Sequence, residues 1–483
     1  MVASRRVTMI HFGTSGWRGV VGEEFTFSNV RRVVDAVAMV LTRQATGGEV
    51  VISYDTRLLS EKFAREAVAV LTHHGIHTVI SDRDVPTPCL AHSVRERGAA
   101  LGIMFTASHN PPEYNGVKLY TRRGTPAPHE LTDAVEAEVA ARWATFEDFF
   151  VPQRQLATTA ALAEGYIARI EAGIDWDAIV SAGLVIAVDP LFGTAREFID
   201  RVLLAHGVPT HVIHTTKDPY FGGYAPECVA QNLAGLRDKV REAHADLGLA
   251  TDGDGDRFGV LDRRCRAIPA NLIIALLTEY LLQRRRVPGA VGRTCATTRL
   301  VDRVAHGQGR QLIETPVGFS HLAPLLDSGE VGVAAEESAG LGVAPHLPER
   351  DGIYAALLVA EMVAVERRSL DELIRSLFAR YGTLVSRRVQ LPLKDTTPAA
   401  LDRLAARTFT EFAGILVTRQ ERSDGLLLEL ADGSWVLGRL SGTEPKLRIY
   451  AEATSSRRLL AMVREARRLV TTAEEEEGHV RNR

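Results

Sequence analysis

The run Val50-Val51-Ile52-Ser53-Tyr54, which ends at Asp55, decides how this chain folds. Its β-branched and aromatic residues predict a buried strand. Residues 62–74 then repeat apolar side chains on one helical face, and residues 77–81 predict a second strand. A proline-rich breaker, a helix and the apolar run 101–105 follow. Strands that alternate with helices in this order predict a parallel sheet with helices on both faces.

The same order of elements returns twice further along the chain. A strand over 184–188 ends at Asp189, and a helix is expected over 194–206. A third unit is expected to contain a helix over 270–284 and a strand over 332–335. A chain of 483 residues is too long for one hydrophobic core and predicts three or four domains.

Past Leu391 the pattern changes to short strands between helices, which predicts a smaller α+β domain. The expected elements are a helix over 399–412, strands over 425–430, 434–440 and 446–453, and a closing helix over 456–471. The acidic run 474–477 is expected to be a frayed, solvated tail. The predicted domains are residues 1–155, 156–262, 263–388 and 389–483.

Composition and charge exclude several classes of partner. The formal net charge is −3, so nothing in the overall charge favours nucleic acid or an anionic membrane. The four cysteines form no Cys-x-x-Cys pair and are read as reduced thiols. The basic N-terminus is not followed by the apolar segment of a signal peptide. A cytoplasmic protein is therefore expected.

Thr106-Ala107-Ser108-His109-Asn110-Pro111-Pro112 follows the strand predicted at 101–105. A serine hydroxyl on a turn stiffened by two prolines is a candidate nucleophile, because the scaffold fixes the oxygen while the loop exposes it. An ordinary Ser-His-Asn-Pro turn is the alternative.

Asp252-Gly253-Asp254-Gly255-Asp256-Arg257 follows another apolar run. Three carboxylates at alternate positions repel one another by about 4 kcal/mol for each pair at 4 Å and an effective dielectric near 20. A divalent cation removes this penalty, and oxygen ligands with open positions favour Mg²⁺. A solvated acidic loop is the alternative.

Two further segments have the composition of anion-binding loops. Arg439-Leu440-Ser441-Gly442-Thr443-Glu444-Pro445 lies between two predicted strands, and Arg448 follows it. Guanidinium groups, hydroxyls and a glycine can together form a phosphate cradle. A β-turn with incidental arginines explains the segment equally well. Gly13-Thr14-Ser15-Gly16-Trp17-Arg18-Gly19 has similar chemistry but is a common kind of turn.

Glu336-Glu337-Ser338-Ala339-Gly340 joins acceptors to a hydroxyl after a predicted strand. This set suits a polyol such as a sugar, although a helix N-terminus with an acidic first turn fits as well. A hydroxyl nucleophile, a magnesium loop and a phosphate clamp together indicate phosphoryl transfer. The chain has no Gly-x-x-x-x-Gly-Lys-Ser/Thr motif, so a nucleotide donor is not indicated.

With these four ordered motifs, the chain resembles the α-D-phosphohexomutase superfamily, the phosphoglucomutases and phosphomannomutases, over essentially its whole length. The resemblance implies three similar α/β domains with mixed sheets and a smaller α+β C-terminal domain around a central cleft. It also implies that Ser108 carries a phosphoryl group and binds Mg²⁺ together with Asp252, Asp254 and Asp256.

The resemblance assigns further roles residue by residue. Arg18 and Arg257 would lie near the seryl phosphate, and Lys118 would assist proton transfer with His109 as a neighbouring candidate. Glu336 and Ser338 would contact the sugar hydroxyls, with Val317 and Gly318 in a second loop near the sugar. Arg350 stands near the expected sugar site, where relatives often have Lys. The clamp for the non-reacting phosphate would consist of Arg439, Ser441, Gly442, Thr443 and Arg448.

The implied reaction interconverts hexose 1- and 6-phosphates through phospho-Ser108 and a hexose 1,6-bisphosphate. Glucose is favoured because Glu336-Glu337-Ser338 is similar to phosphoglucomutase members. Phosphomannomutase or phosphoglucosamine mutase activity is the alternative, and a sugar-phosphate phosphatase or a non-catalytic sensor is more remote. A monomer or homodimer without nucleic-acid or membrane partners is expected.

Overall fold

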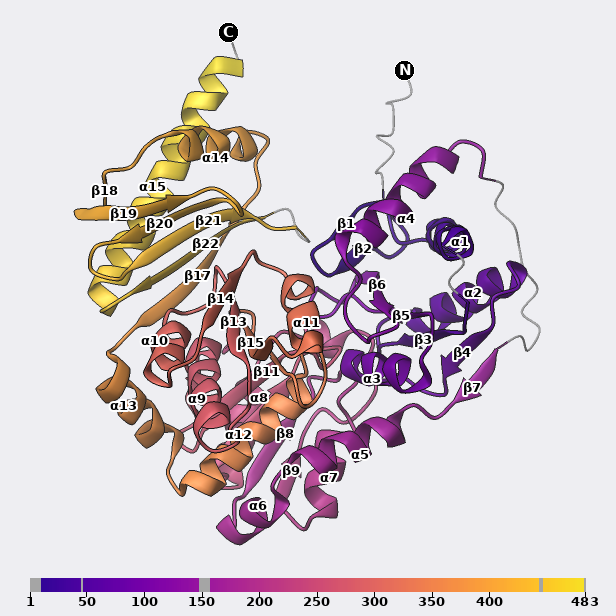
Figure 1. The fold of residues 1–483 in the computed structure, drawn as a ribbon, viewed down its shortest axis with the longest axis horizontal. Coiled ribbons are helices and arrows are strands. Elements are labelled where there is room, and N and C mark those ends of the chain that lie inside the picture. The colour runs from indigo at the N-terminus through magenta and orange to yellow at the C-terminus, as the bar shows by residue number, and fades with distance from the viewer. Residues whose placement is uncertain (1–9, 45–46, 147–156, 443–445, 482–483) are drawn as a thin grey trace.

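A computed structural model describes residues 10–44, 47–146, 157–442 and 446–481. The chain forms three α/β units and a fourth unit built on an antiparallel sheet (Figure 1). The first unit has a seven-stranded sheet in the order β1-β2-β6-β5-β3-β4-β7, in which β5, β3, β4 and β7 are parallel. Its elements are β1 (Phe12–Gly13), β2 (Gly16–Val20), α1 (Phe27–Arg43), β3 (Val50–Tyr54), α2 (Ser60–His73), β4 (Thr78–Ser81), α3 (Thr87–Arg97), β5 (Leu101–Phe105), β6 (Tyr114–Thr121), α4 (His129–Arg142) and β7 (Thr158–Ala160).

The second unit has a five-stranded sheet in the order β12-β11-β10-β8-β9. Strands β10, β8 and β9 are parallel, and β11 runs antiparallel to β10. Its elements are α5 (Ala163–Gly173), α6 (Trp176–Ala182), β8 (Ile186–Asp189), α7 (Ile199–Ala205), β9 (Thr210–Val212), η1 (Phe221–Gly223), α8 (Ala234–Glu242), β10 (Leu247–Thr251), β11 (Phe258–Asp262) and β12 (Ala267–Ile268).

The third unit has a four-stranded sheet in the order β14-β13-β15-β16, and β16 is its antiparallel strand. Its elements are α9 (Ala270–Gln283), β13 (Ala290–Thr294), α10 (Leu300–Gly307), β14 (Leu312–Thr315), α11 (Phe319–Ser328), β15 (Val331–Glu336), β16 (Gly340–Val343), α12 (Gly352–Glu366) and α13 (Leu370–Tyr381). The three units thus share one plan, in which parallel strands are followed by one or more antiparallel strands.

The fourth unit has a six-stranded sheet in the order β17-β22-β21-β20-β19-β18. Helices α14 and α15 pack against each other and against this sheet. Its elements are β17 (Val385–Pro392), α14 (Thr397–Ala406), β18 (Glu411–Phe412), β19 (Ile415–Glu421), β20 (Leu426–Leu430), β21 (Trp435–Leu440), β22 (Lys446–Ala453) and α15 (Ser456–Arg481).

The apolar cores show how the units are joined. One continuous core contains residues of all three α/β units, among them Val51, Ile186 and Leu357. The fourth unit has its own core around Leu447 and Met462. A small separate cluster joins the third and fourth units; its buried members are Cys295, Ala296, Leu427, Trp435, Leu437 and Tyr450.

The predicted fold class is confirmed, whereas three local expectations are wrong. Helix α7 begins at Ile199 rather than 194, because Glu197 takes a left-handed φ of 62°, which a right-handed helix does not contain. Helix α14 ends at Ala406, because residues 411–412 form strand β18 against β19.

The third wrong expectation concerns the acidic run 474–477, which continues helix α15 instead of fraying. Glu474 is buried there. It accepts hydrogen bonds from Lys394 Nζ at 2.6 Å and from Thr397 Oγ1. One donor precedes the fourth unit's first helix and the other begins it, and together they give the carboxylate fixed partners.

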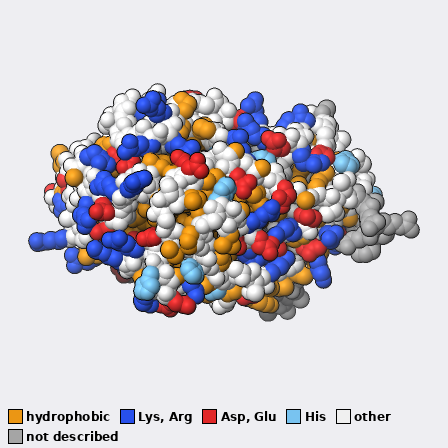
Figure 2. All heavy atoms as spheres, turned by 90° about the horizontal axis from the view of Figure 1, so that it is seen from below, with side chains coloured by type: hydrophobic (Ala, Val, Ile, Leu, Met, Phe, Trp, Pro, Cys, Tyr) orange, Lys and Arg blue, Asp and Glu red, His pale blue; other side chains and the backbone are white. Residues whose placement is uncertain are grey.

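The domain boundaries stay predictions, and the sheets give points of comparison. The first sheet includes β7 at 158–160, beyond the boundary predicted at 155. The second sheet includes β12 at 267–268, beyond 262, and the fourth begins with β17 at 385, before 388. Figure 2 shows the face seen from below Figure 1, where basic and acidic side chains are interspersed. None of the described helices is long and apolar enough to cross a membrane.

Candidate active site

Four of the predicted motifs have residues on loops that each join two neighbouring antiparallel strands. In each α/β unit, the loop runs from a parallel strand to its antiparallel neighbour. The β5–β6 loop contains Ser108, the β10–β11 loop contains the three aspartates, and the β15–β16 loop contains Ser338. In the fourth unit the β21–β22 loop contains Ser441 and Gly442. The shared sheet plan therefore repeats one loop position for each part of the site.

The Ser108 loop has an unusual backbone. Ser108 has φ 53°, in the left-handed region that non-glycine residues rarely adopt. Its N–H donates to Thr106 Oγ1 at 2.8 Å, and its carbonyl oxygen accepts from Arg57 Nη2 at 2.5 Å. Arg57 also donates to the carbonyl of Asn110 at 2.6 Å. The surrounding structure therefore fixes a conformation that the serine itself does not favour.

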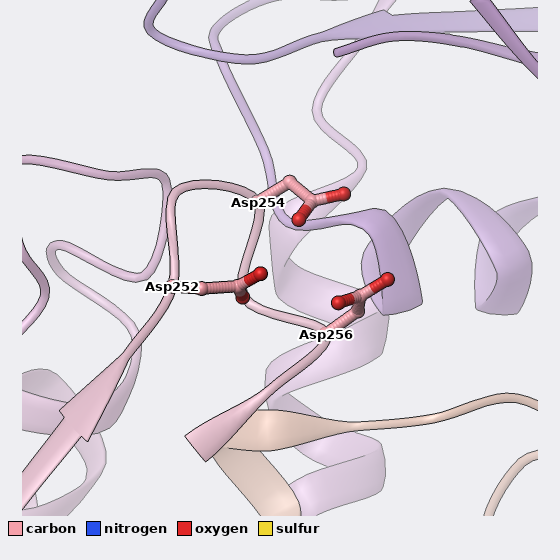
Figure 3. Close-up of side chains that lie close together, drawn as sticks. All are labelled: Asp252, Asp254 and Asp256. Atoms are coloured by element: carbon pink, nitrogen blue, oxygen red, sulfur yellow. The ribbon is translucent and has the colours of Figure 1, made fainter. Parts of the chain in front are cut away.

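The aspartate loop brings three carboxylates together. Asp252, Asp254 and Asp256 are buried, and their ligand atoms lie within 4.8 Å of one another. Figure 3 shows the three side chains around one space, with Asp252 after β10 and Asp256 before β11. Neighbouring units hold the loop: Thr87 N–H donates to the carbonyl of Asp254 at 2.8 Å, and Gly352 N–H donates to that of Gly255 at 3.0 Å.

The serine and aspartate loops meet directly. Ser108 Oγ lies 3.0 Å from Asp252 Oδ2 and donates a hydrogen bond to it. His109 Nδ1 lies 3.4 Å from the same hydroxyl. The approach depends on Gly253, because a Cβ there would lie 2.8 Å from the carbonyl oxygen of Ser108. Two segments that are 144 positions apart in sequence thus form one centre.

The expectation of an exposed hydroxyl is wrong for this conformation, because Ser108 is only 1% exposed. His109 and Arg257, which cover this part of the site, are both about 9% exposed and line the cleft above it. The Ser108 hydroxyl is therefore buried against Asp252, and Ser108 is not among the residues that line the cleft.

Lys118 and Arg350 neutralise part of the acidic charge. Lys118 Nζ, on β6, donates to Asp254 Oδ2 at 2.6 Å and to Asp256 Oδ2 at 2.9 Å. Arg350 donates to Asp256 Oδ2 at 2.9 Å and to Glu336 Oε2 at 3.0 Å. Arg350 therefore links the aspartate loop to the loop predicted to contact sugar.

Burial and charge shift the ionisation of several site residues. Burial, with repulsion from Asp256 and Asp254, raises the pKa of Asp252 well above its usual value. Burial also acts to raise the pKa of Asp256, but Arg350, Lys118 and Arg257 outweigh it and lower that pKa. Burial and nearby arginines, Arg257 first, lower the pKa of His109 well below its usual value. The imidazole is therefore neutral at neutral pH.

A cleft above this centre brings together most of the other predicted residues. Its lining contains Arg18, His109, Arg257, Val317, Gly318, Glu336, Ser338, Arg350, Arg439 and Arg448. Glu336 ends β15, and the segment after it is a turn into β16 rather than a helix N-terminus. Burial and the nearby Arg257 lower the pKa of Arg18 to about 10. Arg18 Nη1 also donates to Asn110 Oδ1 in the Ser108 loop.

The predicted phosphate loop faces the N-terminal glycine-rich loop across the cleft. A Cβ at Gly442 would lie 3.5 Å from Thr14 Cγ2, and a Cβ at Gly318 would lie 3.7 Å from Thr14 Cβ. Ser441 N–H donates to the carbonyl of Lys446 at 2.9 Å, which closes the loop at its base. Thr443 lies outside the described residues.

Comparisons with known proteins agree with this geometry. Residues 9–144, 164–265 and 269–381 match alpha/beta/alpha domains I, II and III of the family described as phosphoglucomutase/phosphomannomutase. Residues 388–469 match its C-terminal domain. The chain belongs to the phosphoglucomutase/phosphomannomutase family.

Relatives in this mutase family carry different names. A phosphoglucomutase of Komagataeibacter xylinus is 30% identical over 94% of this chain and 89% of its own. A probable phosphoglucosamine mutase of Methanothermobacter thermautotrophicus is 31% identical over 91% of this chain and 93% of its own. The crystal structure of a putative phosphomannomutase from Thermus thermophilus has a TM-score of 0.84 and 33% identity, covering 96% of this chain and 99% of that one. The chain is thus a mutase-type isomerase, and the comparisons leave its sugar open.

The aspartate loop of this mutase fits a divalent cation. Asp254 Oδ1 and Asp256 Oδ1 are buried, and neither has a hydrogen-bond partner among the described residues. Buried carboxylate oxygens without partners are costly unless a cation or another donor approaches them. Hard oxygen ligands of this kind suit Mg²⁺. The three aspartates could therefore hold the ion beside Ser108 Oγ.

The sequence did not single out several residues that shape the site. Thr294, Ala296, Arg388 and Tyr450 line the cleft but belong to no predicted motif. Arg57 holds the Ser108 loop, and its place in Asp55-Thr56-Arg57, directly after β3, is the signal that could have identified it. Asp424 contacts the clamp from a neighbouring loop and carries no recognisable motif.

Proposed function

We propose that this protein transfers a phosphoryl group reversibly between the 1- and 6-positions of a hexose phosphate, with glucose preferred. The observation that carries the proposal is the 3.0 Å contact between Ser108 Oγ and the buried aspartate triad. Such a centre suits phosphoryl transfer, which depends mainly on positioning and on neutralising charge. The arginines across the cleft supply a separate place for a second phosphate.

In the first half-reaction, a substrate hydroxyl attacks the phosphoryl group of phospho-Ser108. The new bond joins that hydroxyl oxygen to phosphorus, and the bond from phosphorus to Ser108 Oγ breaks. The substrate hydroxyl gives up its proton, and Ser108 Oγ regains one. His109, at 3.4 Å from Oγ, and Lys118, on the far side of the aspartates, are the two groups positioned to move protons.

In the second half-reaction, the hexose 1,6-bisphosphate presents its other phosphate to Ser108, and the same bonds form and break in reverse. The clamp residues Arg439, Ser441, Gly442, Thr443 and Arg448 would hold whichever phosphate is not reacting. Arg18 and Arg257 would stabilise the seryl phosphate. Mg²⁺ held by Ser108 phosphate, Asp252, Asp254 and Asp256 would supply Lewis-acid stabilisation of the transferred group.

Glucose is proposed first because of Glu336-Glu337-Ser338, and the cleft contains all three residues. Glucosamine is a second candidate, because relatives about 31% identical are named probable phosphoglucosamine mutases. The test supplies glucose, mannose and glucosamine 1-phosphates separately with Mg²⁺ and a trace of the matching 1,6-bisphosphate. The proposal expects the highest kcat/KM for glucose 1-phosphate. A higher value for either other sugar overturns the glucose preference while keeping the reaction class.

The phosphoserine role is tested by mass and by mutation. The purified protein should carry one phosphate on Ser108, and Ser108→Ala should remove it and reduce turnover by at least ~10⁴-fold. Inorganic phosphate released at the rate of substrate loss would instead support a phosphatase. Absence of turnover on all three sugars would support a sensor. A cytoplasmic monomer or homodimer stays a prediction.

A further inference from the structure

We propose that Asp424 is a positioning residue that fixes the phosphate-clamp arginine Arg439 and the sugar loop at Val317–Gly318 in one arrangement. The proposal rests on the proposed function and adds a residue that couples two of its subsites. Asp424 lies in the turn between β19 and β20 of the fourth unit.

Each oxygen of the Asp424 carboxylate has a different partner. Oδ1 accepts from Arg439 Nε at 2.9 Å, within the fourth unit. Oδ2 accepts from the backbone N–H of Val317 at 2.8 Å, in the third unit. Both partners line the cleft, whereas Asp424 does not. One side chain behind the cleft wall therefore connects a phosphate contact to a sugar contact.

The contact also sets which face of Arg439 points to substrate. Because Nε–H is used by Asp424, a bidentate contact to phosphate would be made through the two Nη groups. Gly425 has φ 97°, and a Cβ there would lie 2.8 Å from Arg439 Cβ and 2.3 Å from the carbonyl oxygen of Gly438. Because Gly425 has no Cβ, the turn can lie close to the start of the Arg439 side chain while the Asp424 carboxylate orients its end.

Movement of the fourth unit would separate these two contacts. Arg439 and Asp424 belong to the same unit and would move together, whereas Val317 belongs to the third unit. Only with the fourth unit docked does the Val317 N–H have Asp424 as its acceptor. Capture of phosphate by Arg439 and placement of the sugar loop would then become one event, which lowers KM more than it changes the chemical step.

The chain offers a closely matched control in Asp432, between β20 and β21. Asp432 also accepts from a backbone N–H, that of Ser434 at 3.0 Å, and from an arginine Nε, that of Arg458 at 3.2 Å. It is not among the residues that line the cleft. Asp432→Asn therefore removes the same kind of carboxylate from the same unit without touching the two subsites.

The experiment compares full-length wild type, Asp424→Asn, Asp424→Ala and Asp432→Asn. Steady-state kinetics with glucose 1-phosphate gives KM and kcat. Hydrogen exchange of the Val317 amide reports its hydrogen bond to Asp424, the docking bond, without needing turnover. We expect Asp424→Ala to raise KM roughly 10- to 100-fold, because it removes a hydrogen bond to a charged group, with kcat within about 3-fold. Asp424→Asn should fall between this variant and wild type. Val317 exchange should become faster only in the Asp424 variants.

The outcomes separate the two proposals. Wild type that turns over normally, with Asp424 variants of unchanged KM, overturns the positioning role. Unchanged Val317 exchange in Asp424→Ala overturns the docking bond, whether or not any substrate is found. Equal losses in Asp424→Asn and Asp432→Asn also overturn the proposal, because they show a general effect on the fourth unit. If the wild type is inactive on every hexose phosphate, the proposed function is rejected. Hydrogen exchange of the Val317 amide then still tests its hydrogen bond to Asp424.

Discussion

Arg57 shapes the Ser108 loop although it never faces the cleft. Arg57 is 3% exposed, and its guanidinium donates to the carbonyls of Ser108, Asn110, Pro111 and Tyr114 at 2.5, 2.6, 2.7 and 3.0 Å. It also pairs with Asp55 at 3.2 Å. An arginine that holds four carbonyls can keep Ser108 in its left-handed conformation.

Arg57→Met is therefore expected to reduce both stability and turnover. Removing one member of a buried ion pair costs about 3–5 kcal/mol, because the other charge stays buried. A loop displaced by ~1 Å lowers kcat about 10²-fold. Denaturant unfolding and kcat measure the two effects. The double variant Asp55→Asn/Arg57→Met should recover part of the stability but not kcat; recovery of both would show that Arg57 acts only through stability.

Glu349 predicts a pH-dependent stability. It is fully buried, and burial, opposed by Arg350 and assisted by Asp256, raises its pKa from 4.5 to about 7. Because the folded-state pKa is the higher one, the stabilisation is complete below pH 4.5 and is lost as pH rises through 7. At about 1.4 kcal/mol for each pKa unit, the loss is about 3 kcal/mol.

Glu349→Gln should remove this dependence. The variant should match wild type at pH 4, below the unfolded-state pKa, and exceed its free energy of unfolding by about 3 kcal/mol at pH 8. Denaturant unfolding at the two pH values measures the difference. Glu164→Gln, at an exposed position on α5, is the control and should show no gain at pH 8. Parallel pH profiles for wild type and Glu349→Gln would contradict the prediction.

At the scale of elements, the loops between parallel and antiparallel strands form the site only because glycines let them approach. Gly253→Ala would place a Cβ 2.8 Å from the Ser108 carbonyl oxygen and 2.8 Å from Pro226 Cγ. Overpacking of this kind costs about 1–3 kcal/mol, and separation of the two loops should lower kcat about 10²-fold. Gly47→Ala, with no described atom within 4 Å of its Cβ, should leave the free energy of unfolding and kcat unchanged. A wild-type kcat in Gly253→Ala would contradict the prediction that the two loops need a glycine at this position.

Elements whose residues carry their own signal could be predicted from the sequence. The strands at 50–54, 101–105 and 446–453 have the predicted bounds, because their apolar residues point into local cores. The helix expected from 194 begins only at 199, because Glu197 takes a left-handed φ of 62°. The segment before Glu197 contacts the aspartate loop, far away in sequence, since Thr194 N–H donates to the carbonyl of Gly253 at 3.0 Å.

In the site, too, residues that stand in a recognisable motif could be predicted and the others could not. Ser108 and the three aspartates stand in compact motifs, so the sequence alone identifies them as candidates, and the structure adds the 3.0 Å contact from Ser108 to Asp252. Asp424 has no such motif, since its function depends on Arg439 and on the Val317 N–H of another unit. A sequence indicates which groups exist, whereas their partners depend on how the units pack.

At the scale of the whole molecule, the units differ in how firmly they are joined. The three α/β units share one continuous core, whereas the fourth has its own and meets the third through a small apolar cluster. Figure 1 shows the fourth unit at the upper left and the first at the upper right, and residues of both line the cleft. The cavity in the cleft is about 40 Å³, against roughly 300–1,000 Å³ for typical small-molecule sites, and a larger cavity of about 350 Å³ adjoins it and shares Arg257, Ser338 and Tyr450 with it. We therefore expect a hexose phosphate to reach the part of the cleft nearest Ser108 when the fourth unit moves away from the first.

A disulfide across the cleft tests this movement. A Cβ at Gly442 would lie 3.5 Å from Thr14 Cγ2, so Thr14→Cys/Gly442→Cys brings two sulfurs within reach of each other. Oxidation should close the cleft and reduce turnover at least ~10-fold relative to the same variant when reduced, because product cannot leave. Thiol titration measures the fraction cross-linked, and reductant should restore the rate. The oxidant should leave the turnover of Thr14→Cys alone and of Gly442→Cys alone unchanged. If fully cross-linked protein turns over as fast as the same variant with its cysteines reduced, substrate reaches Ser108 without the fourth unit opening.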